Sequence, residues 1–230
     1  TLKRISGIAG GSISEEIISF DFGSIASHIR VSPYFENTIF VGTQAGRLFK
    51  LTDAHALPSV DDITGTLDVT GNVSCIELGV DEDQILVTFS NYGVSSIWET
   101  IDGGLTWSEK EGDLPDMPVR WALYNPNNHD EVILATEVGV WSTTDFNLPS
   151  PSWTASNSGL ANVRTDMLQI RDSDNFVIAA THGRGLFSSS GFTEEPLEVG
   201  VYPGDTDNNG IVDALDVLPI GVYFFENGTP

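Results

Sequence analysis

The residues of this sequence whose types and spacing best suit chemistry are carboxylates and amides near its C-terminal end. Residues 205 to 216 fit a calcium-binding pattern in which side-chain oxygens recur at positions one, three and five, and a glycine at position six allows a sharp turn. A backbone carbonyl at position seven, a direct or water-mediated carboxylate at position nine and a closing carboxylate at position twelve complete the shell. The sequence therefore predicts a Ca²⁺ site, with the ion as cofactor. Its predicted ligands are Asp205, Asp207, Asn209, Ile211, Asp213 and Asp216, with Gly210 at the turn.

The surroundings of this loop resemble a dockerin. Aspartate rather than glutamate stands at position twelve, and the phrases Gly-Ile-Val and Asp-Val-Leu-Pro-Ile-Gly are similar to dockerin-like tails of secreted bacterial proteins. The resemblance covers about residues 203 to 225 of a predicted segment 203–230. A dockerin normally has two such loops and this sequence has one, which departs from the pattern for cohesin recognition. Pro219 lies where the exiting helix would lengthen, so a short or kinked helix is expected.

The predicted calcium site also indicates a location. Aspartate ligands with water in the shell are typical of the weaker sites of extracellular modules, which work at millimolar calcium. A secreted or cell-surface bacterial protein is therefore expected. Residues 194–202, which include Glu194-Glu195-Pro196, are predicted to be a linker.

A repeat of about 46 residues fills most of the preceding sequence. Each copy has a turn, an apolar run rich in β-branched residues, a small polar residue, a glycine and a further apolar pair. The glycines, Gly46, Gly93, Gly139 and Gly185, follow one another at steps of 47, 46 and 46. Each unit predicts a hairpin whose glycine supplies a conformation that other residues resist. A shorter apolar stretch precedes each hairpin, and after the second and third hairpins a segment ends at Trp107 and Trp153.

About four strands per repeat is the unit of a β-propeller blade. The predicted fold class is therefore all-β, with about four blades in residues 1–193 and a small C-terminal calcium loop with a short helix. Residues 1 to 20 either complete one blade by circular closure, or the chain is the C-terminal part of a larger propeller. Its start at Thr1 without methionine indicates a processed or trimmed piece of a longer precursor. An open four-blade fragment would expose sheet faces and need a partner chain or copies of itself.

One turn of the repeat resembles a known family. Residues 100–107, Thr-Ile-Asp-Gly-Gly-Leu-Thr-Trp, are similar to the Asp-box of sialidase-type and sortilin-type (BNR-repeat) propellers, and residues 142–146 with Trp153 resemble a degenerate copy. The resemblance covers about residues 20 to 192 and implies a structural role at the blade periphery. Asp102 is expected to accept hydrogen bonds from its own turn, with Gly104 in the turn and Trp107 covering strand ends.

The composition excludes some partners. The 33 Asp and Glu residues against ten Lys and Arg give a formal net charge of −23, which repels phosphate backbones and anionic membrane surfaces. No apolar run is long enough to span a bilayer. The single cysteine, Cys75, excludes an intramolecular disulfide and is expected to be a small buried hydrophobe.

Little in the sequence predicts catalysis. The arginines are scattered, whereas a sialidase needs an arginine cluster, and no pair of carboxylates can be assigned to opposite walls of a cleft. The first hypothesis is a non-enzymatic module for adhesion, assembly or binding of a ligand such as carbohydrate. The alternatives are a structural subunit of an extracellular assembly and a fragment of a polysaccharide-degrading glycoside hydrolase.

Overall fold

A computed structural model of the 230-residue chain describes residues 2–18, 20–160 and 162–192. The chain divides into two compact units, Thr1–Phe192 and Thr193–Pro230, and the account below concerns the first. The predicted linker 194–202, the calcium ligands Asp205 to Asp216 and the rest of segment 203–230 lie outside the described residues.

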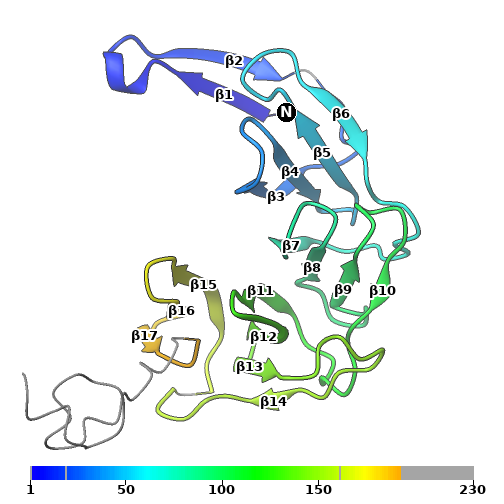
Figure 1. The fold of residues 1–230 in the computed structure, drawn as a ribbon, viewed down its shortest axis with the longest axis vertical. Helices are drawn as coiled ribbons and strands as arrows, with labels where there is room; N and C mark the ends of the chain where they lie inside the picture. Colours follow the sequence, from blue (N-terminus) through cyan, green and yellow to red (C-terminus); the bar gives the residue numbers. More distant parts are fainter. Residues whose placement is uncertain (1, 19, 161, 193–230) are drawn as a thin grey trace, which may run out of the picture. The chain divides into compact units, whose positions relative to one another are not determined.

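The described part is built almost entirely of antiparallel strands (Figure 1). A two-stranded sheet contains β1 (Leu2–Ser6) and β2 (Ser14–Ile18), which flank a 3₁₀ turn η1 (Ile8–Gly10). Sheet I contains β3 (Ala26–Val31), β4 (Ile39–Thr43), β5 (Leu48–Thr52) and β6 (Ser59–Asp62). Sheet II contains β7 (Val73–Leu78), β8 (Ile85–Phe89), β9 (Ile97–Thr100) and β10 (Ser108–Glu109). Sheet III contains β11 (Val119–Asn125), β12 (Asn128–Thr136), β13 (Gly139–Thr143) and β14 (Thr154–Ala155). Sheet IV contains β15 (Thr165–Arg171), β16 (Phe176–Thr181) and β17 (Gly185–Ser189).

The all-β prediction with one sheet per repeat is confirmed. Sheets I to III each hold four strands in chain order, and sheet IV holds three within the described residues. The first strands of consecutive sheets pack together, β3 against β7, β7 against β11 and β11 against β15. No helix in residues 2–18, 20–160 and 162–192 is long and apolar enough to cross a membrane.

A β-bulge recurs at the same place in all four sheets. The pairing of first and second strands shifts register between Ala26 and His28, between Val73 and Cys75, and at the matching points of β11 and β15. The extra residue at the bulge carries a hydroxyl in the first two sheets. Ser27 Oγ donates to the Val73 carbonyl at 2.8 Å, and Ser74 Oγ donates to the Val119 carbonyl at 2.6 Å. The bulge therefore joins the first strands of sheets I and II to the next sheet.

The glycines of the repeat stand where the sequence predicts hairpin turns. Gly46, Gly93, Gly139 and Gly185 have φ of 83°, 73°, 81° and 83°. Gly46 has a second constraint, because an added Cβ would lie 2.1 Å from the Val69 carbonyl oxygen. A left-handed conformation and a close backbone approach together explain glycine there.

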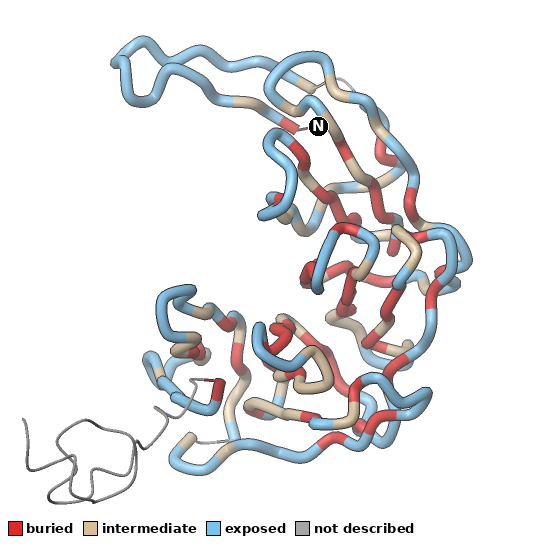
Figure 2. Tube along the Cα trace, viewed as in Figure 1, coloured by how far each residue is buried: buried red, intermediate tan, exposed pale blue. Residues whose placement is uncertain are grey.

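Apolar side chains fill the spaces between neighbouring sheets, and Figure 2 shows the buried residues along the sheet strands. One buried cluster joins Phe40 and Leu48 of sheet I to Ile76 and Val87 of sheet II. Two further clusters join sheet II to sheet III and sheet III to sheet IV. Sheets II and III thus bury apolar side chains on both faces, each against a neighbouring sheet on either side.

The hairpin of β1 and β2 forms a sheet of its own. Its five residue pairs run from Leu2 with Ile18 to Ser6 with Ser14, and it is not paired with sheet IV among the described residues. Circular closure by residues 1 to 20 is therefore not the arrangement found. Leu2 and Ile18 instead pack in a cluster with Phe22, Val41 and Phe49, against sheet I.

Candidate functional site

The turn from Thr100 to Trp107 is held by hydrogen bonds centred on Asp102. Asp102 Oδ1 accepts from Thr100 Oγ1 at 2.7 Å and from the Thr106 backbone N–H at 2.9 Å, and Oδ2 accepts from Thr106 Oγ1 at 2.6 Å. These hydrogen bonds, with the Thr106 side chain first, lower the pKa of Asp102 to about 2. Gly104, at φ 92°, donates its N–H to Thr100 Oγ1 at 3.0 Å. Asp102 is therefore an ionised acceptor for its own turn.

The same arrangement recurs one repeat later without the glycines. Thr143 Oγ1 donates to Asp145 Oδ1 at 2.6 Å, and the Ser152 N–H donates to the same oxygen at 2.9 Å. The hydrogen bond from Thr143, followed by that from the Ser152 N–H, holds the pKa of Asp145 below its usual range. In sheet IV the backbone N–H of Gly191 donates to Ser189 Oγ at 3.1 Å, so glycine stands where the other two turns have aspartate.

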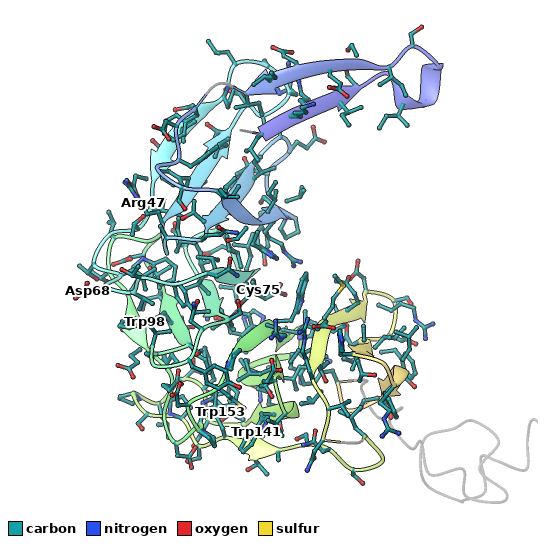
Figure 3. All side chains as sticks on the ribbon, turned by 180° about the vertical axis from the view of Figure 1, so that it is seen from behind. Arg47, Asp68, Cys75, Trp98, Trp141 and Trp153 are labelled. Atoms are coloured by element: carbon teal, nitrogen blue, oxygen red, sulfur yellow. The ribbon has the colours of Figure 1, made fainter. Side chains whose placement is uncertain are left out.

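The tryptophan after each aspartate turn reaches back to the preceding sheet. The indole Nε1 of Trp107 donates to the Ile63 carbonyl at 3.2 Å, and the backbone N–H of Trp107 donates to Thr66 Oγ1 at 3.0 Å. In the same way, the indole Nε1 of Trp153 donates to the Lys110 carbonyl at 3.2 Å, and the backbone N–H of Trp153 donates to Asp113 Oδ1. Both indoles are buried. These turns therefore join sheets. Trp153 directly precedes β14 and belongs to the buried cluster against which Trp141 packs; both tryptophans are labelled in Figure 3.

The first strands of sheets I and II carry an ion pair that the sequence analysis did not single out. Arg30 on β3 places Nη2 3.0 Å from Oε2 of the buried Glu77 on β7, without hydrogen-bond geometry. Burial raises the pKa of Glu77 to about 7, and the Arg30 charge opposes this rise. The sequence does hold a signal that could have pointed to this pair, because one charged residue interrupts each of the short apolar stretches Ile29-Arg30-Val31 and Ile76-Glu77-Leu78.

A histidine and a tryptophan lie close to this pair. The rings of His28 on β3 and Trp121 on β11 are 5.3 Å apart between centroids, in an edge-to-face arrangement. Burial first, and then the Arg30 charge, lower the pKa of His28 to about 4, so the imidazole is neutral at pH 7. Trp121 Nε1 is buried without a hydrogen-bond partner.

Cys75 occupies the position equivalent to His28 in the next sheet. It is buried, as expected, and its Sγ lies 3.7 Å from the Ala122 carbonyl oxygen (Figure 3). Burial raises the pKa of the thiol, which keeps it protonated and unreactive as a nucleophile.

A second buried network joins sheets II and III. Lys110 Nζ lies 3.3 Å from Glu99 Oε2 and donates to the carbonyls of Phe146 and Leu148 at 2.9 and 3.1 Å. Tyr124 Oη donates to Glu99 Oε1 at 3.0 Å. Burial, followed by the Glu99 charge, raises the pKa of Tyr124. A comparable pair, Lys50 with the buried Glu82, joins sheets I and II at 2.6 Å.

The arginines do not gather into one anion-binding site. Six of them pair with six different carboxylates: Arg4 with Glu16, Arg30 with Glu77, Arg47 with Asp62, Arg120 with Glu137, Arg164 with Asp166 and Arg171 with Asp174. Within the described ranges, no group of three or more His, Cys, Asp or Glu side chains could hold a metal ion.

A pocket with a volume of about 510 Å³ lies between sheets III and IV. Its walls are apolar, with Ile133, Leu168 and Val177, and its other lining is rich in serine and threonine. The lining carboxylate, Glu131, accepts hydrogen bonds from Asn125 and Asn128. The volume is that of a small-molecule site, but the lining offers hydroxyls rather than an acid and base pair.

Comparisons with known proteins show the fold. No protein-family model matches the sequence, and no curated protein matches it significantly. The β-propeller domain of Cps50 (Swd1) from Myceliophteria thermophila is similar at a TM-score of 0.50 and 15% identity, over 69% of this chain and 49% of that one. The computationally designed Ika4 protein has a TM-score of 0.51 and 11% identity, over 72% of this chain and 91% of that one.

A GH74 enzyme from Niastella koreensis is also similar, at a TM-score of 0.48 and 15% identity, over 80% of this chain and 31% of that one. The chain thus spans about half of the Swd1 propeller domain and about a third of the GH74 enzyme. Together with the four sheets packed through their first strands, the likeness to the Swd1 domain identifies a β-propeller fold whose sheets are its blades.

Proposed function

We propose that this chain is a non-enzymatic β-propeller scaffold that binds partners outside the cell. The observation that carries the proposal is the use of its buried charges. Glu99, Lys110 and Glu82 are each engaged with a group on a neighbouring sheet. Charges committed to contacts between sheets stabilise a rigid framework and are not free to exchange protons with a substrate.

The aspartate turns support the finer assignment to Asp-box propellers. Asp102 and Asp145 make matching hydrogen bonds, and the tryptophans that follow them make matching contacts with the preceding sheet. The role we assign to Asp102, Gly104 and Trp107 is accordingly structural. The turn that holds them lies between β9 and β10, the strands of sheet II farthest from its first strand, which fits a peripheral position.

The C-terminal segment supplies the calcium part of the proposal. The ligand series Asp205, Asp207, Asn209, Ile211, Asp213 and Asp216 has the oxygen chemistry and spacing of a calcium loop, and Asp at position twelve fits a dockerin-like, weakly binding site. Millimolar calcium is an extracellular condition, which supports secretion or display on a cell surface. Calcium binding and local folding are then linked.

Calorimetric titration of the full chain with Ca²⁺ tests this part. We expect one site with a dissociation constant of about 10⁻⁴ to 10⁻³ M. Asp205→Ala is expected to abolish it because the first ligand of the loop is lost. Asp68→Ala, which removes an exposed carboxylate from the segment after sheet I, is the matched control and should leave binding unchanged.

Two outcomes contradict the proposal. If the full chain gives no calcium-binding signal, or if Asp205→Ala binds calcium with the same affinity, the proposed calcium loop is wrong. If the purified chain turns over a polysaccharide and keeps this activity after repurification, the proposal of a non-enzymatic scaffold is wrong.

A further inference from the structure

A tryptophan fills the same place in each of the first two interfaces between sheets. Trp107, between sheets I and II, is 7% exposed, and Trp153, between sheets II and III, is 5% exposed. Each indole Nε1 donates to the backbone carbonyl of the residue that directly follows the fourth strand of the preceding sheet. That residue is Ile63 after β6 for Trp107, and Lys110 after β10 for Trp153.

In the third interface this place is the pocket of about 510 Å³ between sheets III and IV. Ser156, which directly follows β14, lines the pocket. Leu160 also lines it and is half-buried, whereas the leucines at the same place after sheets I and II, Leu67 and Leu114, are buried. The three leucines are equivalent, because each donates its N–H to the carbonyl three residues earlier. The pocket is therefore the third copy of a place that a side chain fills in the other two interfaces.

The turn that ends sheet IV begins like the turn that ends the third strand of sheet III. In residues 143–146 and 189–192, which are 46 residues apart, an N–H donates to the hydroxyl oxygen two residues earlier, at 3.3 and 3.1 Å. The last residue of each range, Phe146 and Phe192, is buried in the interface with the preceding or following sheet cluster to which it belongs. The repeat is thus in register up to Phe192.

The same step continues along the sequence. From Trp107 to Trp153 is 46 residues, and one further step leads to Val199, which is followed by Gly200, Val201 and Tyr202. These residues lie outside the described ranges, and β-branched and aromatic residues of this kind favour a strand. Among the described strands β17 pairs only with β16, so its other edge is free to accept a strand.

We propose that residues 199–202 of this chain occupy the pocket, as the fourth strand of sheet IV. The strand pairs with β17 in the register of β13 with β14, in which Ser142 lies opposite Thr154, so Ser188 lies opposite Gly200. Val199 takes the place of the tryptophans and meets the apolar walls of the pocket. The segment then belongs to the propeller and not to the predicted linker. The inference rests neither on the calcium loop nor on the scaffold role.

Engineered disulfides in the full chain test this register. Ser188→Cys with Gly200→Cys should oxidise within the chain, because a disulfide needs Cβ atoms about 4 Å apart. Ser142→Cys with Thr154→Cys, on the paired strands β13 and β14, is the positive control. Ser188→Cys with Val199→Cys is the matched control and should oxidise about tenfold more slowly, because successive side chains of a strand point to opposite faces. Peptide mapping by mass spectrometry, with a chelator present, measures each crosslink.

A second variant tests the pocket itself. Val199→Trp should raise the melting temperature by about 2 to 4 °C, because the larger side chain fills the pocket as Trp107 and Trp153 fill theirs. Glu198→Trp places the same side chain one residue earlier, on the other face of the strand, and should give no such rise.

Four results overturn the proposal. Equal oxidation of the pairs with Gly200 and with Val199 means that the segment has no fixed register. Oxidation of neither, while the β13–β14 control oxidises, leaves the pocket to a small molecule or a separate chain. A crosslink between two chains assigns the strand to a second copy. Val199→Trp that melts no higher than Glu198→Trp places position 199 outside the pocket. The chelator makes each of these failures distinct from failure of the calcium loop.

Discussion

At the scale of the residue, burial decides whether the pKa of a carboxyl group falls or rises. Asp102 is only partly buried and its pKa falls to about 2 because hydrogen bonds stabilise the charge, whereas Glu77 is buried and its pKa rises to about 7. For Glu77 the loss of hydration outweighs the attraction of Arg30. The ion pair between sheets I and II therefore costs free energy when the carboxyl is charged.

Glu77→Gln tests this cost through its pH dependence. Between about pH 4.5 and pH 7 the native protein binds more protons at this site than the unfolded chain, so the contribution of Glu77 to the free energy of unfolding falls as pH rises. Glutamine does not titrate, so the stability of the variant relative to the parent should rise by up to about 3 kcal/mol from pH 4.5 to pH 8. Urea unfolding at both pH values measures the difference.

The control for this series is Glu15→Gln, which changes a carboxylate in an exposed pair with Lys3. It should alter the free energy of unfolding by less than about 0.5 kcal/mol. A constant difference between Glu77→Gln and the parent across the pH range would show that Glu77 is not the titrating group.

At the scale of the element, the turn between third and fourth strands joins one sheet to the one before it. The aspartate fixes the turn, and the turn directs the tryptophan at carbonyls of the preceding sheet. Trp98 and Trp141 form another repeated contact, since each indole N–H donates within its own sheet, to Ser95 and Val138 respectively (Figure 3).

Trp107→Ala should destabilise the protein by about 3 to 5 kcal/mol, because it removes a buried indole from the cluster between sheets I and II. Denaturant unfolding checks the value. Tyr92→Ala, at a side chain that is 63% exposed, is the control and should cost less than about 0.5 kcal/mol. Similar losses for the two variants would mean that Trp107 does not support the interface.

At the scale of the whole molecule, the net charge of −23 sets conditions on stability and association. Like charges on a compact surface repel each other, and salt screens this repulsion. Exposed pairs such as Lys3 with Glu15 are weakened by salt but contribute little. The repulsion is therefore the larger of the two effects.

The melting temperature should rise as NaCl increases from about 10 mM to about 1 M, over which the Debye length shortens from about 30 Å to about 3 Å. Differential scanning calorimetry with a chelator present measures the change without any contribution of calcium. Choline chloride at the same ionic strength should have the same effect. A melting temperature that falls with salt would show that attractive pairs dominate.

The sequence by itself determined the repeat, the strand class and the positions of the hairpin glycines, because these depend on local periodicity and backbone conformation. Gly46 and Gly185 could be placed on turns, and Asp102 in its own turn, since all their constraints lie within a few residues. The predicted calcium ligands Asp205 to Asp216 follow from spacing alone and stay a prediction.

The tertiary structure decided which residues meet across repeats. Arg30 and Glu77 are 47 positions apart, and His28 meets Trp121 across two sheets, so no local pattern could pair them. Circular closure by residues 1 to 20 was possible on sequence, and the pairing of β1 with β2 alone, and not with sheet IV among the described residues, showed that it is not the arrangement found. The burial that raises the pKa of Glu77 and the exposure of Ile29 both depend on which strands lie beside them. Both therefore exist only in the folded chain.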